Sequence, residues 1–165
     1  MGLPKSAERV QAAIRARGFD YEVIILPDSA RTAQMAADAL GCVVGQIAKS
    51  LVFRKKESGA ALLVIASGSN RVDEKKVAAL VGEALGKADA EFVRLVTGYA
   101  IGGVPPVGHA TEIETLIDED LLNYEVIWAA GGVPESVFAL PPGDLPTLTG
   151  GRVATVRKEE PGHGH

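Results

Sequence analysis

Cysteine is almost absent from this chain, and so are long apolar runs. Cys42 is the only cysteine among 165 residues, so neither an intramolecular disulfide nor a cluster of thiol metal ligands can form. We expect Cys42 to be a small buried hydrophobic residue, and the protein to reside in a reducing cytoplasm. The apolar run at residues 60–66 is far shorter than the roughly 20 residues that a membrane span needs, so no membrane association is expected.

Excess positive charge and metal-ligating clusters are missing too. The formal net charge of −4 argues against indiscriminate nucleic-acid binding, which relies on many Lys and Arg side chains. Two of the three histidines, His163 and His165, lie at the very end of the chain, so neither a metal site nor another cofactor is expected. The first residues lack an apolar stretch with a small-residue cleavage site, and secretion is therefore not expected either.

The overall composition is that of an ordinary globular protein. Hydrophobic residues make up 47% and charged residues 23% of the chain. A chain of this length usually forms one domain around one core. We expect a single domain over residues 1–158, followed by a flexible tail at 159–165.

The spacing of apolar residues and turn residues predicts a mixture of helices and strands. Helices are expected at residues 6–17, between a cap at Thr32 and a stop at Gly41, after a cap at Asp73, at 90–96 and, as a short turn, at 142–148. Strands are expected at residues 21–26, 46–53, 60–66, 124–130, 136–140 and 152–156. The strands at 46–53 and 60–66 flank a polar turn, which predicts a hairpin of two central strands. The fold class is therefore α+β, a mixed β-sheet surrounded by helices.

Lys49 is the most informative single residue, because it lies in a strand that is otherwise small or apolar. Strand alternation places it on one face with Ile47, Leu51 and Phe53. Burying an ammonium group without a partner is costly. Two interpretations are open: the side chain reaches solvent at an edge of the sheet, or it projects into a pocket and binds an anionic or carbonyl oxygen.

The segment at residues 98–108 contains four glycines and two prolines, too many for a regular helix or strand. Glycines allow backbone N–H groups to approach a ligand and to point at a developing oxyanion. The segment has neither the Gly-Lys-Ser/Thr end of a Walker loop nor the glycine spacing of dinucleotide-binding folds. A tight turn across the sheet and a ligand cradle are equally compatible with this composition.

Three further polar groups have two interpretations each. The segment 67–73 joins a strand to a helix, where phosphate can bind, so Arg71 is either a phosphate contact or part of an ordinary turn. His109 either hydrogen-bonds a substrate or stabilises a turn. The acidic group at 118–120 is expected to cap a helix in solvent rather than to catalyse.

Four segments, in this order and spacing, resemble the YbaK/ProX family: TAQMAA at 32–37, QIAKSLVF at 46–53, NRVD at 70–73 and GYAIGGVPPVG at 98–108. The similarity runs from about residue 6 to 156. It implies a compact α+β fold related to the editing insertion domain of bacterial prolyl-tRNA synthetases. It also implies that the protein hydrolyses esters and removes wrongly attached amino acids from tRNA.

The resemblance assigns roles to individual residues. In such proteins the lysine that matches Lys49 holds the aminoacyl end, the loop that matches Gly102 and Gly103 stabilises the oxyanion, and a terminal ribose hydroxyl assists the attacking water. This agrees with a sequence that offers oxygen-binding groups but no evident nucleophile or general base. Further positions are expected to bind the substrate: Thr32, Ser50, Ser67, Gly68, Asn70, Arg71, Ile101, Pro105 and His109.

The partners implied by the resemblance are aminoacyl-tRNA and an aminoacyl-tRNA synthetase. Val52, Ser67 and Ile101 are candidates for the pocket that selects the amino acid. The basic residues at 54–56, 71 and 75–76 are either tRNA contacts or solvated surface. The sequence names neither the amino acid nor the oligomeric state. Two other functions are compatible with it: a module that recognises a tRNA end or a synthetase without cleavage, and a hydrolase of small free esters.

Overall fold

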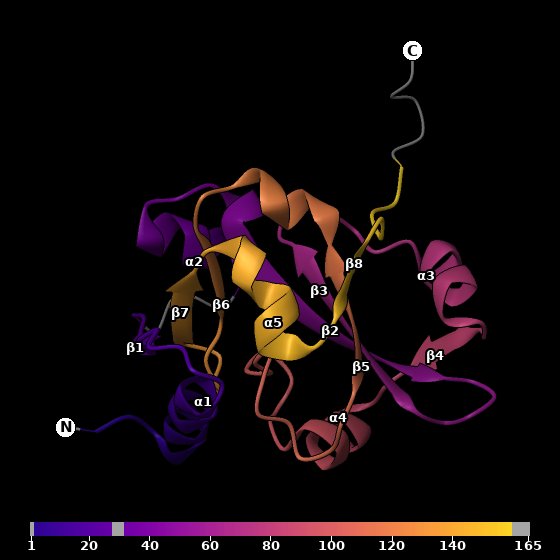
Figure 1. Cartoon of the computed structure of the whole chain (residues 1–165), viewed down its shortest axis with the longest axis horizontal. Helices are drawn as coiled ribbons and strands as arrows, with labels where there is room; N and C mark the ends of the chain where they lie inside the picture. Colours follow the sequence, from indigo (N-terminus) through magenta and orange to yellow (C-terminus); the bar gives the residue numbers. More distant parts are fainter. Residues whose placement is uncertain (1, 28–31, 160–165) are drawn as a thin grey trace.

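The computed structural model describes residues 2–27 and 32–159, which form one mixed β-sheet with helices on both faces (Figure 1). Within these ranges the α-helices are α1 (Lys5–Ala16), α2 (Ala33–Leu40), α3 (Glu74–Val81), α4 (Ala90–Thr97) and α5 (Leu145–Thr149). Short 3-10 helices are η1 (Val44–Gln46), η2 (Glu119–Asn123) and η3 (Pro142–Asp144). The strands are β1 (Ile24–Ile25), β2 (Ile47–Lys55), β3 (Ala61–Ser67), β4 (Leu85–Lys87), β5 (Glu114–Asp118), β6 (Ile127–Ala130), β7 (Ser136–Leu140) and β8 (Arg152–Ala154).

The hairpin of β2 and β3 forms the centre of the sheet, as the sequence predicts. The strand order is β1-β7-β6-β2-β3-β5-β8, and β4 adds a further pairing to β2. The pairs β2–β3 and β6–β7 are antiparallel, whereas β2–β6, β3–β5 and β5–β8 are parallel. The predicted α+β class with a mixed sheet is confirmed.

Strand β3 is buried on both faces, because its alternate side chains enter two separate parts of the core. Leu63 and Ile65 pack in a cluster with α1, α4 and α5. Leu62 and Val64 pack on the other face in a cluster that includes Val77 of α3. In Figure 1, α1 and β1 lie with β7 at one end of the sheet, and α3 and β4 lie at the other.

Side-chain and glycine caps fix the ends of the helices where the sequence predicts them. Thr32 accepts a hydrogen bond from the Met35 N–H at 3.1 Å at the start of α2, and Gly41 ends this helix with a φ of +71°. Asp73 caps α3 by accepting from the backbone N–H groups of Lys75 and Lys76. The starts of α2 and α3 are thus determined by their local sequence.

The predicted strands differ from the observed ones mainly where pairing is brief. The regions 21–26, 124–130 and 152–156 contain strands, but only 24–25, 127–130 and 152–154 are paired. Strands β4 and β5 are missing from the prediction. β4 pairs over three positions only, and β5 starts in a Glu- and Thr-rich stretch and gains its strand conformation from parallel pairing to β3. Tertiary pairing, not local propensity, made these segments strands.

Two side chains and the tail need correction. Cys42 is only half-buried against the cluster beside α2, not fully buried as expected. Asp118 does cap η2, but its exposed fraction is 0%, so the predicted position in solvent is wrong. Of the predicted tail 159–165, Glu159 forms ion pairs with Lys76 and Arg157, and residues 160–165 lie outside the described ranges.

Candidate functional site

One edge of β2 is interrupted in the middle of the sheet. On one side β2 pairs with β3 from residue 48 to 54, and on the other it pairs with β6 at Ile47 and Ala48 and with β4 from Phe53 onward. In the part of the chain that the structure describes, no strand pairs with residues 49–52 on this second side. A strand edge without a partner presents backbone N–H and C=O groups, so this gap is suited to binding a ligand.

A pocket of about 280 Å³ lies at the gap and contains residues from both sides of it. Its described lining comes from the start of α2, the middle of β2, the glycine loop and the β6–β7 hairpin: Thr32, Ala33, Ala36, Ile47–Leu51, Ile101, Gly102, Val104, Trp128–Ala130, Pro134, Ser136 and Val137. A second hollow of about 180 Å³ shares five of these residues and continues toward Phe53 and Val93. The site is therefore a small cleft with an apolar extension.

Lys49 brings the only ionisable side chain of the described lining into this pocket. It is half-buried, and its Nζ donates a hydrogen bond to the Asn70 carbonyl oxygen at 2.9 Å. Burial lowers the pKa of Lys49, the nearby Asp118 charge opposes this effect, and the Arg71 charge adds to it. An ammonium group has three donors, so hydrogens remain for a ligand oxygen. The structure favours the pocket interpretation of Lys49 over the snorkelling one.

Ser50 contributes a hydroxyl whose hydrogen-bonding capacity is not used within the described structure. Its Oγ is buried and has no partner there, although Ser50 lines both hollows. A buried hydroxyl without a partner costs roughly 1–3 kcal/mol. Such a group becomes favourable when a ligand supplies the missing partner.

The glycine loop reaches the pocket through Ile101, Gly102 and Val104. Gly102 has a φ of +93°, a conformation that favours glycine, and no hydrogen bond between described residues uses its N–H. The Gly103 N–H already donates to the Ala100 carbonyl at 3.0 Å. A Cβ atom at Gly103 would lie 2.8 Å from the Gly132 carbonyl oxygen, so this glycine permits close packing of two loops.

Ser67, Gly68 and Asn70 lie beside the pocket rather than in its wall. The Ser67 hydroxyl donates to the Gly45 carbonyl at 2.7 Å, and a Cβ atom at Gly68 would lie 2.4 Å from the Val44 carbonyl oxygen. Asn70 contributes its carbonyl to Lys49. Arg71 is exposed next to these residues. This segment supports Lys49 and places the exposed Arg71 guanidinium near it.

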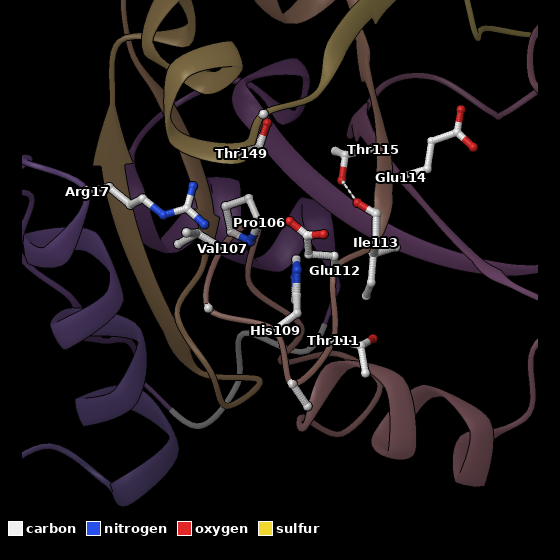
Figure 2. Close-up of a pocket in the computed structure, with 13 residues that line it drawn as sticks. Arg17, Pro106, Val107, His109, Thr111, Glu112, Ile113, Glu114, Thr115 and Thr149 are labelled. Carbon is white, nitrogen blue, oxygen red and sulfur yellow. Dashed lines mark hydrogen bonds between the residues drawn. The ribbon is translucent and has the colours of Figure 1, made fainter.

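Pro105 and His109 belong to a different part of the glycine loop. Pro105 is buried, and its carbonyl oxygen lies 2.6 Å from His109 Nε2. His109 lines a separate pocket of about 550 Å³ together with Arg17 and Glu112 (Figure 2). Burial lowers the pKa of His109 despite the hydrogen bond to Pro105. The structure thus gives His109 a turn-stabilising contact and does not bring it into the wall of the Lys49 pocket.

Sequence reasoning missed several residues that shape the site. Trp128 and Pro134 line the pocket from the β6–β7 hairpin, and Asp118 supports it from the end of β5. No local sequence pattern predicts that Trp128 and Pro134 line the pocket, because their position depends on the parallel pairing of β6 with β2. For Asp118 a signal existed, namely an acidic residue directly after an apolar stretch, but β5 was not recognised as a strand.

Neither a metal site nor a membrane span is present among residues 2–27 and 32–159. No group of three or more His, Cys, Asp or Glu side chains is arranged to hold a metal ion in these ranges. None of the helices described is both long enough and apolar enough to cross a membrane.

Comparisons with known proteins agree with this geometry. The sequence model of the aminoacyl-tRNA editing domain matches residues 27–148. EbsC of Enterococcus faecalis, named as a candidate Cys-tRNA(Pro)/Cys-tRNA(Cys) deacylase, is 30% identical over 78% of this chain and 79% of its own length. A proline–tRNA ligase of Limosilactobacillus fermentum is 35% identical over 56% of this chain, which is 17% of the ligase.

The fold has a near-identical counterpart among solved structures. A crystal structure described as a candidate trans-editing enzyme for prolyl-tRNA synthetase has a TM-score of 0.91 and 51% sequence identity. The match covers 96% of this chain and 100% of that one. The similarity therefore extends over the sheet, the glycine loop and the pocket.

The fold is that of a domain that edits aminoacyl-tRNA, and the pocket beside Lys49 is its candidate site. The chain belongs to the aminoacyl-tRNA editing domain family, as the resemblance to YbaK/ProX proteins predicts. It is accordingly an enzyme of the aminoacyl-tRNA deacylase class, a hydrolase.

Proposed function

We propose that this protein is a trans-editing hydrolase, a separate protein that removes a small amino acid from mischarged tRNA in the cytoplasm. The observation that carries the proposal is Lys49, the single ionisable side chain in the described wall of a 280 Å³ pocket. An ammonium group in such a place can bind a carbonyl or phosphate oxygen strongly, because few other polar groups compete for it. We further propose that residues 1–158 form the editing domain and that the rest is a tail.

The chemistry needs oxygen-binding groups rather than a protein nucleophile. A water molecule forms a bond to the ester carbon, the bond from this carbon to the ribose oxygen breaks, and the proton from the water ends on the leaving ribose hydroxyl. Lys49 and the Gly102 N–H are the donors that we assign to the substrate oxygens. Because the Gly103 N–H is used within its own turn, we assign Gly103 to shaping the loop. A ribose hydroxyl of the substrate assists the water.

The selection of a small amino acid follows from the size of the pocket and its chemistry. Its wall is mostly apolar, with Ile101, Val104 and Trp128 limiting the volume. The unused Ser50 hydroxyl can hydrogen-bond a polar atom of the aminoacyl group. EbsC carries a name for Cys-tRNA(Pro) and Cys-tRNA(Cys), so these two are the first substrates to test.

Contacts to the tRNA itself are assigned to exposed cations near the pocket. Arg71 is exposed directly after Asn70, whose carbonyl binds Lys49. A net charge of −4 does not favour binding along a long stretch of phosphate backbone, so we propose a few local contacts and a synthetase partner that supplies the rest.

The test is deacylation of a panel of tRNAs charged with alanine, serine, cysteine, threonine or proline, comparing wild type with Lys49→Ala. Hydrolysis of one or a few members that is lost in the variant supports the proposal. Binding without any hydrolysis would instead indicate the non-catalytic module. Equal rates on free aminoacyl esters and on aminoacyl-tRNA would indicate a small-ester hydrolase.

A further inference from the structure

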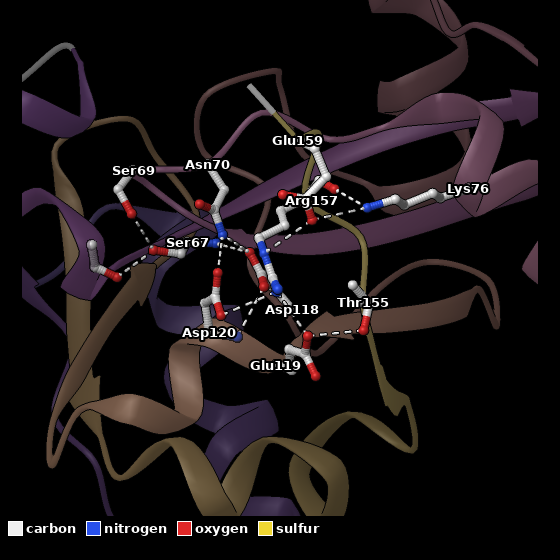
Figure 3. Close-up of polar contacts among 11 residues, drawn as sticks. Ser67, Ser69, Asn70, Lys76, Asp118, Glu119, Asp120, Thr155, Arg157 and Glu159 are labelled. Atoms are coloured by element: carbon white, nitrogen blue, oxygen red, sulfur yellow. Dashed lines mark hydrogen bonds and ion pairs between the residues drawn. The ribbon is translucent and has the colours of Figure 1, made fainter. Parts of the chain in front are cut away.

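A buried carboxylate lies behind Lys49, at the place where three strand ends meet. β3 and β5 are parallel, so their carboxyl ends lie at the same edge of the sheet, and β2 begins there because it runs antiparallel to β3. Lys49 is near this end of β2, the 67–70 turn follows β3, and Asp118 ends β5. Figure 3 shows the polar contacts that join the turn to the residues after β5.

Asp118 is fully buried and hydrogen-bonded on both of its oxygens. Oδ2 accepts from the Ser67 N–H at 3.0 Å and from Asn70 Nδ2 at 2.9 Å, and Oδ1 accepts from the Asp120 N–H at 2.9 Å. Within the described residues no Lys, Arg or His nitrogen lies within 4.0 Å of this carboxylate. Burying a charge without compensation is unfavourable, so the nearby Lys49 ammonium matters for Asp118 as well.

Asn70 connects this carboxylate to the lysine. Its side-chain amide donates to Asp118 at 2.9 Å and to Asp120 at 2.8 Å, and its N–H donates to the Ser67 carbonyl at 2.9 Å. Together these bonds hold Asn70 in place, and with it the start of the peptide group that carries its carbonyl. The carbonyl of the same residue accepts the hydrogen bond from Lys49 Nζ at 2.9 Å.

We propose that Asp118 is a positioning residue for Lys49. Asp118 holds the Asn70 carbonyl against the lysine ammonium, and it supplies the buried negative charge near this ammonium. The inference rests on the proposed catalytic role of Lys49. Asp118 touches no substrate, since it is absent from the pocket wall. Its effect reaches the reaction through the place and charge of Lys49.

Asp120 provides the matched comparison, because it binds the same amide in a different environment. Its side chain is 29% exposed and already forms an ion pair with Arg157 at 3.3 Å. Glu119 pairs with Arg157 as well, at 2.7 Å. Solvent and Arg157 screen both charges, whereas Asp118 is fully buried and forms no ion pair with any described Lys, Arg or His side chain.

The charges that face Lys49 have opposite effects on it. Asp118 from the end of β5 raises the pKa of Lys49, and Arg71 from the segment after β3 lowers it. Asp120 accepts from the same Asn70 amide nitrogen as Asp118 and is paired with Arg157. The other described residues of the pocket wall carry no ionisable group. Removal of either charge should therefore move the pKa of Lys49 in a predictable direction.

The first experiment compares Asp118→Asn with Asp120→Asn in single-turnover deacylation across pH. The amide oxygen of the new side chain at position 118 can still accept two of the three hydrogen bonds. Its NH₂ group then lies opposite the third N–H donor, so that two donors face each other. We expect a loss in kcat of about tenfold to a hundredfold, with a smaller change in KM, because a displaced catalytic group costs rate rather than binding. Asp120→Asn should stay within about threefold of wild type.

A second experiment measures the pKa of Lys49 directly and does not depend on activity. Titration of the Lys49 side chain by NMR should give a lower pKa in Asp118→Asn and a higher one in Arg71→Gln than in wild type. A merely structural role of Asp118 would leave the pKa of Lys49 unchanged in a folded Asp118→Asn protein, and Arg71→Gln shows that the titration detects a nearby charge. Unchanged titration and an unchanged kcat in Asp118→Asn would overturn the positioning role. Full activity of Lys49→Ala would instead overturn the proposed function.

Asn70→Ala covers the case in which Asp118→Asn does not fold. This variant removes both amide donors but keeps the backbone carbonyl that accepts from Lys49. We expect its kcat to fall in the same direction, with Lys49 less well ordered. A folded Asn70→Ala protein with wild-type kcat would contradict the proposal that Asp118 positions Lys49 through its hydrogen bond to Asn70.

Discussion

The pocket around His109 and the pocket around Lys49 differ in how many of their hydrogen-bonding groups remain free within the described structure, and the smaller pocket has more of them free. The pocket around His109 is the larger, about 550 Å³ against about 280 Å³, and it contains more polar and ionisable side chains. Most of those groups are bound to the protein itself. Arg17 donates to the Leu148 carbonyl at 2.8 Å, His109 contacts the Pro105 carbonyl, and three threonines donate to nearby backbone carbonyls. Figure 2 shows one of these bonds, from Thr115 to the Ile113 carbonyl.

The smaller pocket keeps its hydrogen-bonding capacity available. Lys49 uses one of its three donors, and the Ser50 hydroxyl and the Gly102 N–H have no partner among the described residues. Groups that are fully satisfied in the folded chain gain little from a ligand, whereas unsatisfied groups gain the whole interaction. Unused donors therefore favour the smaller pocket as the candidate site, even though the other pocket has the larger volume.

The largest expected effect comes from removing the cation of each pocket. Lys49→Met should lower kcat/KM for deacylation by about 10²–10³-fold, because it deletes a donor to the developing oxyanion. Arg17→Met, the matched change in the larger pocket, should stay within about threefold of wild type. Single-turnover deacylation measures both, and circular dichroism shows that each variant is folded.

An equal loss in both variants would break the comparison, since it would mean that the larger pocket also contacts the tRNA. Filter binding of charged tRNA then separates the possibilities. A loss of tRNA binding in Arg17→Met would show that the larger pocket contacts the tRNA. Unchanged binding would mean that the substitution lowers activity by destabilising the protein.

The glycine loop allows a second test, because it contributes to both pockets. Gly102→Ala and Gly108→Ala both place a side chain at a positive φ, +93° and +83°. At Gly108 the new Cβ would also lie 2.9 Å from the Ala13 Cβ, whereas at Gly102 the nearest atom is Pro134 Cγ at 3.6 Å.

We expect Gly108→Ala to lower the free energy of unfolding by about 2 kcal/mol with little effect on rate. Gly102→Ala should cost less stability but lower kcat by about tenfold or more, because it disturbs a donor of the pocket. Urea denaturation and deacylation assays measure the two quantities. The reverse assignment of effects would show that the catalytic half of the loop has been misplaced.

Ser50→Ala removes a single hydroxyl group and should change stability and activity in opposite directions. The hydroxyl is buried without a partner, so its removal should raise the free energy of unfolding by about 1 kcal/mol. If the hydroxyl binds the substrate, kcat/KM should fall by about tenfold at the same time. Thermal unfolding and deacylation of the best substrate test both parts, and a variant that is more stable and equally active would exclude Ser50 from substrate binding.

The smallest expected effect concerns the pH dependence of stability at His109. Burial lowers the pKa of His109 in the folded protein below its ordinary value near 6.5. The neutral ring therefore stabilises the fold above that value, and this contribution is lost as the pH falls through the lowered pKa of the folded state. The melting temperature of wild type should fall more steeply than that of His109→Gln between pH 7.5 and 5. Parallel curves would mean that His109 is accessible to water.

The sequence predicted the residues of the Lys49 pocket better than it predicted the position of His109. Lys49, Ser50, Ile101 and Gly102 could be placed together because they lie in motifs with a recognisable order, and the structure puts all four in one pocket wall. His109 could not be separated from them, since it directly follows the loop that contains Ile101 and Gly102. The proline-rich turn of 103–108 directs it elsewhere, and only coordinates show that.

Local sequence determined the helix caps, the central hairpin and the presence of a lysine in an apolar strand. These features depend on residues close together in the chain: a Thr or Asp side chain reaching the next turn, glycine at a positive φ, and the alternation of a strand. The role of Asp118 and the gap beside residues 49–52 were decided only by tertiary structure. They arise from pairing between strands far apart in the sequence, and no local pattern encodes which strand ends will meet.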